Sequence, residues 1–381
     1  MKLKVFTISL LLAGAACVSC IREEALNTEA DIESCTLADD VLNRDPVIEN
    51  EKVTLYLKKT ADLSALAPEF TLTPGATISP ASGTTLNFSS PQYYEVTSED
   101  GQWKKQYKVE ATTTYNIPTL FQFEHVRTTK TAKGEYQIFY ETDDSGKETI
   151  VWASGNSGYA LTGAGSGADT YPTYQSNIGK NGKCLALTTR RTGDFGAKMN
   201  MPIAAGNLFL GTFAVLDALT NPLKATKFGI PTDAVPSRIQ GYYKYKSGDT
   251  FYELDESAKD KLKPIPGKRD IFNIYAVFYE STEDMKTLDG TNALAEDNPN
   301  ILAVAQITDA KETDEWDEWT KFDLPFVFRP GKTVNPGKLE AGNYSLAVVF
   351  SSSIDGDHFS GAPGSTLCVD EVTMEYRDEE E

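Results

Sequence analysis

Tyr344-Ser345-Leu346-Ala347-Val348-Val349-Phe350 is the stretch of sequence that decides the fold. The run is nearly continuous in apolar residues, which is expected for a strand buried between two sheets. Helical periodicity along the same part of the chain is confined to single turns. We therefore predict that residues 117–381 form one large all-β domain, a two-sheet jelly roll. Comparable strand-like runs recur at Tyr136–Tyr140, Ile239–Tyr245, Ile271–Tyr279, Ile301–Ile307 and Thr366–Tyr376.

The N-terminal part of the chain has a different β pattern. Apolar and polar residues alternate from Val53 to Leu57 and from Trp103 to Val109, which is typical of strands with one buried face. Glu99-Asp100-Gly101-Gln102 lies between strand-like runs and supplies a hairpin turn. We predict that residues 45–113 form a small antiparallel sandwich.

This segment resembles the immunoglobulin-like modules of Bacteroidetes surface lipoproteins. The residues that carry the resemblance are Ser79-Pro80-Ala81-Ser82-Gly83, Phe88-Ser89 and Glu99-Asp100-Gly101. Such modules usually act as spacers, and no cluster of residues in this segment indicates a catalytic role. The fold class that we expect is all-β, with an N-terminal immunoglobulin-like sandwich followed by the larger jelly roll.

Residues 1–19 have the anatomy of a secretory signal. A positively charged start is followed by an apolar run from Val5 to Ala16, which is too short to span a bilayer. Ser19 is a small residue directly before Cys20, the arrangement of a bacterial lipoprotein signal, in which that cysteine becomes the lipidated first residue. An ordinary cleaved signal is the alternative, because Cys17 stands where a lipoprotein signal usually has leucine.

The residues after Cys20 predict where the protein works. Arg22-Glu23-Glu24 resembles the export signal by which Bacteroidetes lipoproteins reach the outer face of the outer membrane. Residues 20–44 are polar and acidic without a sustained hydrophobic period, so we expect a flexible tether. We therefore expect a lipid anchor in the outer membrane and exposure on its extracellular face.

Composition excludes some classes of partner and chemistry. The 381 residues carry a formal net charge of −19, and an acidic surface repels phosphate backbones, so we expect no nucleic acid partner. Two histidines, His125 and His358, offer little to a zinc site. Cys184 and Cys368 lie in strand-like runs, and the sequence leaves buried free thiols and a disulfide between them as alternatives.

Paired carboxylates would indicate a glycosidase, which needs two carboxyl groups about 5 to 10 Å apart. Acidic clusters occur at Glu253–Glu256 and Glu312–Glu318, but their strongly polar surroundings are typical of solvated loops. Asp355 and Asp357, in the long polar loop from Ser351 to Ser365, are weak candidates for the acid and base. The signal for catalysis is therefore weak.

Aromatic and amide side chains give a stronger signal for sugar binding. A sugar ring needs an aromatic face for its C–H side and planar polar groups for its hydroxyls. Residues 152–156, 238–245 and 351–365 supply this mixture. We expect Trp152, Tyr243 or Tyr245 to stack on a ring, and the candidates for hydrogen bonds are Asn156, Arg238, Lys244, Asp357 and His358.

Several separate motifs, taken in order, resemble the putative carbohydrate metabolism domain of Bacteroidetes lipoproteins. The resemblance implies an N-terminal immunoglobulin-like sandwich, then a jelly roll like those of carbohydrate-active enzymes, with a candidate sugar pocket where related glycosidases bind substrate. It implies no established reaction. The motifs are Trp152-Ala153-Ser154-Gly155-Asn156, Ala205-Gly206-Asn207-Leu208-Phe209-Leu210-Gly211-Thr212-Phe213, Gly241-Tyr242-Tyr243-Lys244-Tyr245, Phe350-Ser351-Ser352-Ser353, and Gly361 with Gly364-Ser365-Thr366-Leu367-Cys368-Val369-Asp370-Glu371.

Two acids near the ends of the jelly roll are candidate calcium ligands. Phe123-Glu124 opens the domain and Val369-Asp370-Glu371 lies on its last strand. In similar jelly-roll carbohydrate-binding modules these strands are neighbours, and acids there often hold a structural Ca²⁺, which takes several oxygen ligands. Glu124 and Asp370 are therefore candidate ligands, and no other cofactor is expected to be required.

Together these observations predict a cell-surface lipoprotein that binds a glycan in a jelly-roll pocket as part of carbohydrate acquisition. The expected partners are a poly- or oligosaccharide, the outer membrane and neighbouring glycan-uptake proteins. A glycoside hydrolase or lyase is the first alternative, favoured by two carboxyl groups in one deep pocket, whereas a single acid favours binding. A structural or adhesive surface protein is the second, and predicts an exposed strand edge and no polar pocket.

Overall fold

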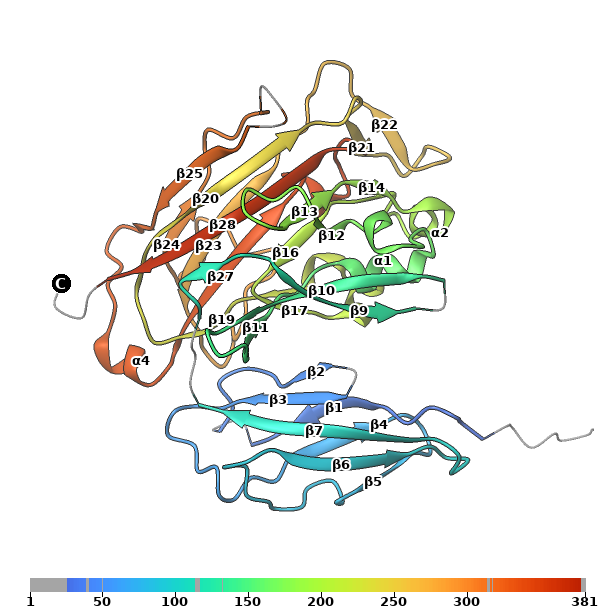
Figure 1. Ribbon diagram of the computed structural model, residues 1–381, viewed down its shortest axis with the longest axis vertical. Helices are drawn as coiled ribbons and strands as arrows, with labels where there is room; N and C mark the ends of the chain where they lie inside the picture. Colours follow the sequence, from blue (N-terminus) through green and yellow to red (C-terminus); the bar gives the residue numbers. More distant parts are fainter. Residues whose placement is uncertain are drawn as a thin grey trace, which may run out of the picture. The chain divides into compact units, whose positions relative to one another are not determined.

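The computed structural model describes residues 26–38, 41–49, 51–113, 117–131, 133–313, 316 and 318–377 (Figure 1). The predicted signal of residues 1–19 and the predicted lipidation site, Cys20, lie outside the described residues. Within them, no helix is both long and apolar enough to cross a membrane. The chain divides into two compact units, a smaller N-terminal one and a larger one that contains everything from Ala111 onward.

The N-terminal strands form the predicted small sandwich. Its core contains the inward side chains of the alternating runs, including Val53, Leu55, Tyr107 and Val109. One sheet has the order β2 (Val47–Glu49), β3 (Lys52–Tyr56), β7 (Lys104–Thr112), β6 (Gln92–Thr97) and β5 (Thr77–Ser79), and the other pairs β1 (Ile32–Thr36) with β4 (Glu69–Leu72). The β3 and β7 segments of the larger sheet pair in parallel and not antiparallel as predicted, since Lys108 N–H donates to Glu51 O and Leu57 N–H to Thr112 O, each at 2.9 Å.

The prediction of a flexible tether over residues 20–44 is wrong for β1. Ile32 and Cys35 are buried, and β1 pairs antiparallel with β4. The register shifts between Ile32 and Ser34, so the two buried side chains are three residues apart instead of two or four. Because of this irregularity, buried and exposed residues do not alternate along the segment. That alternation is the sequence signal by which a strand is recognised.

The larger unit is a sandwich of two antiparallel sheets, which confirms the predicted all-β fold. The β28 sheet has the order β12 (Thr173–Ser176), β13 (Cys184–Thr188), β28 (Thr366–Tyr376), β20 (Pro236–Lys246) and β25 (Thr320–Pro325), with β8 (Leu120–Phe121) also on β28. The β27 sheet has the order β16 (Asn207–Phe209), β27 (Tyr344–Ser351), β23 (Asn273–Glu280), β24 (Ile301–Gln306) and β26 (Val327–Phe328), with β19 (Ile230–Thr232) also on β27.

The β27 sheet is buried on both faces, and this explains the continuous apolar runs. Ile274, Ala276 and Phe278 of β23 belong to the main core between the sheets. Tyr275 and Val277 belong to a second core on the opposite face. That face is covered by connecting segments with short helices and short strands, so burial between the two large sheets accounts for only half of the pattern.

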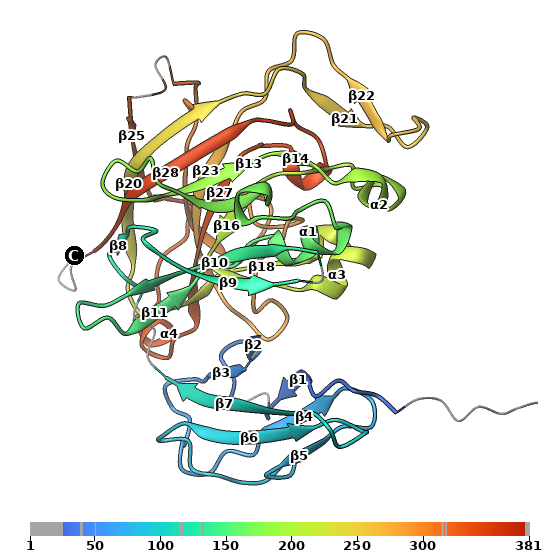
Figure 2. The same ribbon diagram turned by 45° about the vertical axis from the view of Figure 1, so that its right-hand side comes forward.

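The covering segments contain short helices and strands that gather at one side of the larger unit (Figure 2). They include α1 (Asn156–Thr162), α2 (Gly193–Lys198), α3 (Val215–Thr220), β17 (Gly211–Phe213) and β18 (Thr226–Phe228). The remaining elements are β9 (His125–Lys130), β10 (Glu135–Thr142), β11 (Glu148–Val151), β14 (Arg190–Arg191), β15 (Ile203–Ala204), β21 (Tyr252–Leu254), β22 (Leu262–Pro264), α4 (Pro336–Glu340) and 3-10 turns at Ala168–Thr170, Pro222–Lys224 and Gly356–His358.

Cys184 and Cys368 are buried free thiols. They lie on the outer face of the β28 sheet with Ala186, where Trp316 and Trp319 pack against them. The structure therefore supports the free-thiol alternative over a disulfide.

Glu141 of β10 is a buried carboxyl group that makes no ion pair with any of the described residues. Its oxygens accept hydrogen bonds from Trp152 Nε1 at 3.2 Å and from the backbone N–H groups of Gln122 and Phe123, each at 3.4 Å. Burial raises the pKa of Glu141 from 4.5 to about 7. The folded chain therefore holds a proton here that the unfolded chain releases above about pH 4.5.

We predict that Glu141 makes the protein less stable as the pH rises from about 4.5 to about 7. Because the folded state binds more protons in this window, the residue lowers the free energy of unfolding by about 3 kcal/mol across it. Glu141→Gln should therefore flatten the pH dependence measured by chemical denaturation. Glu135→Gln, at an exposed position on the same strand, is the control and should leave the slope unchanged. An identical slope in Glu141→Gln and the wild type would contradict the assignment.

Candidate functional site

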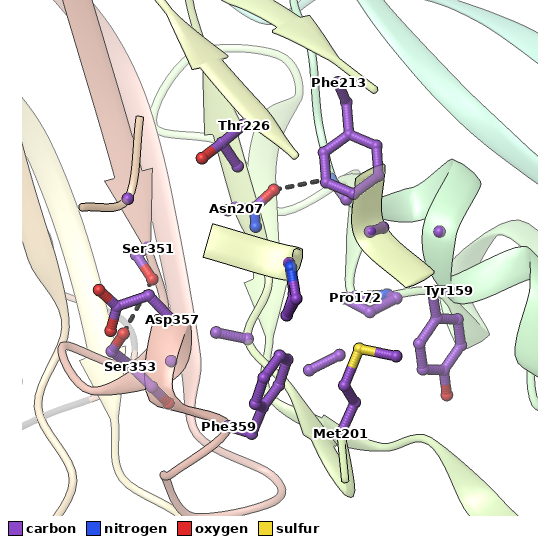
Figure 3. Close-up of a pocket in the computed structure, with 18 of the residues that line it drawn as sticks. Tyr159, Pro172, Met201, Asn207, Phe213, Thr226, Ser351, Ser353, Asp357 and Phe359 are labelled. Atoms are coloured by element: carbon purple, nitrogen blue, oxygen red, sulfur yellow. Dashed lines mark hydrogen bonds between the residues drawn. The ribbon is translucent and has the colours of Figure 1, made fainter. Parts of the chain in front are cut away.

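A cavity of about 290 Å³ lies on the outer face of the β27 sheet (Figure 3). Its floor is formed by β16, β27 and β23, and its walls come from α1, α2, α3 and the loop that follows β27. The floor and walls belong to the larger unit alone. The volume is near the lower end of the range of about 300 to 1,000 Å³ that is usual for small-molecule sites.

Three polar side chains form a row across the floor. Asn207 of β16 and Asn273 of β23 are both register partners of Ser351 on the central strand, β27. Directly opposed residues on antiparallel strands have side chains about 5 Å apart on the same face. All three residues line the cavity, so the strand register brings together groups that are far apart in sequence.

The next row of the floor and most of the walls are apolar. Phe209, Val349 and Tyr275 follow the polar row on the same three strands. From the walls, Tyr159, Met201, Phe213 and Phe359 line the same space (Figure 3). The cavity thus offers large apolar surfaces with a few polar groups at fixed positions, which is the usual composition of a small-ligand site.

Asp357 is the single acidic residue among the described residues that line the cavity. Its Oδ1 lies 2.6 Å from Nδ1 of His358, whose side chain is largely exposed. Burial raises the pKa of Tyr275, and the charge of Asp357 adds to that shift. Asp357 and Tyr275 both line the cavity.

The loop that carries Asp357 is held by the buried carboxylate of Asp270. Its Oδ2 accepts hydrogen bonds from Ser353 Oγ at 2.6 Å, from the backbone N–H of Ala362 at 2.7 Å and from Ser365 Oγ at 2.7 Å. Its Oδ1 accepts from the backbone N–H of Ile271 at 2.9 Å. Burial raises the pKa of Asp270, and these hydrogen bonds act in the opposite direction.

Phe359 adopts a strained backbone conformation at the edge of the cavity. Its φ of 55° is in the left-handed region, where a non-glycine residue costs roughly 1–3 kcal/mol. The conformation ends the 3-10 turn Gly356–His358 and places Phe359 among the residues that line the cavity. Such strain is tolerated where surrounding contacts fix the loop, as Asp270 does here.

The aromatic stacking residues were predicted wrongly. Trp152, Tyr243 and Tyr245 are buried in the main core with at most 2% of their surface exposed. Tyr243 and Tyr245 both pack against Phe272, with ring centroids 4.6 and 4.9 Å away. A ring that is buried in the core has no face available to a sugar.

The predicted polar residues are dispersed, and Asp357 alone among them lines the cavity. Asn156 is fully buried and bonds the backbone of Thr173 in both directions, at 2.7 and 3.1 Å. Arg238 and Lys244 lie on β20, where Arg238 pairs with Asp323 and the Lys244 Nζ lies 4.8 Å from the Trp319 ring.

Asp355 and His358 flank Asp357 in the loop, but neither is among the residues that line the cavity. The Asp355 carboxylate pairs with Lys268 Nζ at 3.1 Å. Asp355 and Asp357 therefore do not form a carboxylate pair facing one pocket, and the prediction of an acid and base at these positions is wrong in that respect.

Glu124 and Asp370 both accept hydrogen bonds from one turn. Glu124 Oε1 accepts from the N–H of Lys183 at 2.8 Å, and Asp370 Oδ2 accepts from the N–H groups of Lys180 and Asn181 at 2.6 and 3.1 Å. Burial raises the pKa of Asp370 to about 6. Within the described part of the chain no group of three or more His, Cys, Asp or Glu residues gathers as for a metal ion. Calcium at this position stays a prediction.

Asn207 and Asn273 are the site residues that the sequence analysis missed. Asn273 is a polar residue at the start of an otherwise apolar strand, and Asn207 stands directly before Leu208 and Phe209. Burying a polar side chain in a strand costs free energy unless it has a hydrogen-bond partner, so such a residue indicates either that partner or a functional role. That signal was available in the sequence, although the pairing of the two residues through Ser351 was not.

We predict that Asp270→Ala destabilises the protein and disorders the cavity loop. The substitution leaves the backbone N–H groups of Ile271 and Ala362 without their acceptor, and each buried donor left unsatisfied costs about 1–3 kcal/mol. Urea denaturation of the mature chain measures the change. Asp249→Ala, at an exposed position, is the matched control and should change stability by less than about 0.5 kcal/mol. Equal stability of the two variants would contradict the role of Asp270.

Comparisons with known proteins agree with this architecture. The putative carbohydrate metabolism domain matches residues 122–375, and the SGBP N-terminal domain, of surface glycan-binding proteins, matches residues 35–111. None of the curated proteins matches the chain.

Two crystal structures are similar over long stretches. A putative glycoside hydrolase from Bacteroides thetaiotaomicron VPI-5482 is 52% identical, with a TM-score of 0.80, over 94% of this chain and 100% of that chain. A putative glycoside hydrolase from Bacteroides vulgatus ATCC 8482 is 45% identical, with a TM-score of 0.63, over 69% of this chain and 100% of that chain. The chain therefore belongs to the family of the putative carbohydrate metabolism domain, and it carries an N-terminal domain of the Bacteroidetes surface glycan-binding type.

Proposed function

We propose that the chain is a surface glycan-binding protein whose cavity holds one end or one branch of a glycan during carbohydrate acquisition. The observation that carries this proposal is the cavity with apolar walls, a polar row and a single acid. Apolar walls suit the C–H faces of sugar rings, and the amide and hydroxyl groups suit their oxygens. The modest volume suits a terminal unit better than the middle of a polymer.

The single acid favours binding over hydrolysis. Glycosidases that use paired carboxylates need two of them across the scissile bond, at about 5 to 10 Å. Asp357 has no acidic partner among the described lining residues, and Asp355 is paired with Lys268. Hydrolysis remains the second candidate function, because the two similar crystal structures are of proteins named as putative glycoside hydrolases. A polar cavity also argues against a purely adhesive role.

We predict that Asp357→Asn weakens glycan binding about tenfold to a hundredfold. A hydrogen bond to a charged group contributes about 1.5–3 kcal/mol, and the amide keeps the shape of the carboxylate. A glycan array with the mature chain identifies the ligand, and calorimetry compares the variants. Asp249→Asn, which is exposed and outside the cavity lining, is the control and should bind like the wild type.

Two outcomes would overturn this proposal. The absence of binding to any plant, host or microbial glycan would remove the binding function. Release of reducing ends from a bound glycan, abolished in Asp357→Asn, would replace it by hydrolysis.

The cell-surface location is part of the same proposal. A glycan-binding domain of the surface type supports exposure outside the cell, and the sequence before it supports a lipid anchor at Cys20. A lipid-anchored glycan-binding protein would hold the glycan at the cell surface for neighbouring uptake proteins.

We predict that Cys20→Ala releases the chain from the membrane fraction, because the variant lacks the sulfur to which the lipid attaches. Mass spectrometry of the wild-type mature N-terminus should find a diacylated or triacylated Cys20. Cys35→Ala is the control, because that cysteine is a buried free thiol, and it should leave the chain membrane-bound. An unmodified Cys20 would contradict the anchor and leave the cavity proposal intact.

A further inference from the structure

The orientation of the Asn207 amide is fixed by the backbone. Its Oδ1 accepts a hydrogen bond from the N–H of Gly155 at 2.7 Å. A backbone N–H can only donate, so the oxygen of the amide must face Gly155 and cannot exchange places with the nitrogen. Asn207 Nδ2 is left as a donor, and it has no hydrogen-bond partner among the described residues.

The second amide of the floor contacts another amide and not a backbone group. Asn273 Oδ1 lies 3.4 Å from Gln306 Nε2, and because both amides can turn over together, this contact does not fix the orientation of Asn273. Between the two amides, the Ser351 hydroxyl donates to the carbonyl oxygen of Ser353 at 2.9 Å. The polar row therefore presents one amide donor of fixed orientation, Asn207 Nδ2, and a ligand that bonds to it must supply an acceptor oxygen.

The charges around the cavity exclude an anionic acceptor. No lysine, arginine or histidine is among the described residues that line the cavity, whereas Asp357 adds a negative charge. The whole chain carries a net charge of −19. A uronate or sulfate group would enter this site without a cation to pair with, which is unfavourable in an apolar surrounding. The acceptor that fits is a neutral oxygen, and a carbonyl oxygen suits the site better than a hydroxyl, whose own proton would need a further acceptor.

The walls and mouth of the cavity favour an apolar group beside that carbonyl. Leu161, Phe195 and Ile354 line the cavity and are also 45%, 44% and 45% exposed, so they form an apolar mouth. Met201 and Phe213 continue the apolar surface inside. Hydroxyl groups of Tyr159, Thr162 and Thr192 also line the walls, but each already donates to a backbone carbonyl oxygen, whereas a methyl group would pack against the apolar side chains.

We infer that the cavity selects a sugar that carries a neutral acyl group, of the N-acetyl or O-acetyl class. This inference rests on the proposed function and names the ligand class of the same site. The acyl carbonyl accepts from Asn207 Nδ2, and its methyl group lies against the apolar walls. Asp357 accepts from a hydroxyl or amide N–H of the same unit.

Matched pairs of ligands test the inference. N-acetylated chitotetraose and cellotetraose share a β-1,4-linked backbone and differ in the acetamido group. An O-acetylated xylo-oligosaccharide and its base-deacetylated form differ only in acetyl esters. Calorimetry with the mature chain should show about tenfold tighter binding of the acetylated member in at least one pair, because the Asn207 Nδ2 donor then gains an acceptor.

Asn207→Asp is the decisive variant. It keeps an acceptor for the Gly155 N–H and removes the donor, so the preference for the acetylated member should disappear. Asn87→Asp is the matched control, because Asn87 Oδ1 likewise accepts a backbone N–H, from Ser89 at 2.9 Å, at an exposed position. The control should keep the preference, and thermal unfolding of both variants verifies that they fold.

The outcomes separate this inference from the function on which it rests. Equal affinity for both members of each pair, or an unchanged preference in folded Asn207→Asp, would overturn the acyl selection while glycan binding stands. Binding only of uronate or sulfated glycans would do the same. If no glycan binds, the proposed function falls, and the inference falls with it.

Discussion

The buried carboxylate of Asp270 is the constraint on which the candidate site depends. It lies at the entrance to β23, and its oxygens accept hydrogen bonds from the loop that connects β27 with β28. One charge thus ties a strand of the β27 sheet to a loop that leads into the other sheet. A buried carboxylate is tolerated when its donors are in place, so the hydrogen bonds from Ser353, Ala362 and Ser365 hold this loop in position. The positions of Asp357 and Phe359 follow from it.

The strands could be predicted because burial leaves a continuous local signal. Runs such as Ile274–Tyr279 are apolar throughout, since the β27 sheet is covered on both faces. The sequence could not predict which tyrosines of β20 point into the core, because aromatic side chains lie on both faces of that strand. Their burial depends on Phe272, a residue distant in sequence. The strand at Ile32 was missed because a register shift disrupts its alternation.

The candidate site was harder to predict than the fold, for a physical reason. Its floor combines Asn207, Asn273 and Ser351, which meet only through the register of three strands. Local patterns pointed instead to Trp152, an aromatic residue beside glycine and amide groups, and the structure buries it in the core. Asp357 was identified because it lies in a long polar loop between two buried strands, where functional residues are frequent.

The division of the cavity into a floor of sheet and walls of connecting segments has an evolutionary consequence. Each floor strand also supplies side chains to the main core, so a change in its backbone would disturb the whole sandwich. Among the described residues, the helices α1, α2 and α3 contribute no side chain to the main core. Connecting segments of this kind tolerate substitution and insertion. Divergence within the family can therefore remodel the walls while the floor is retained. New ligand preferences would arise by exchange of the covering segments, with the amide row inherited unchanged.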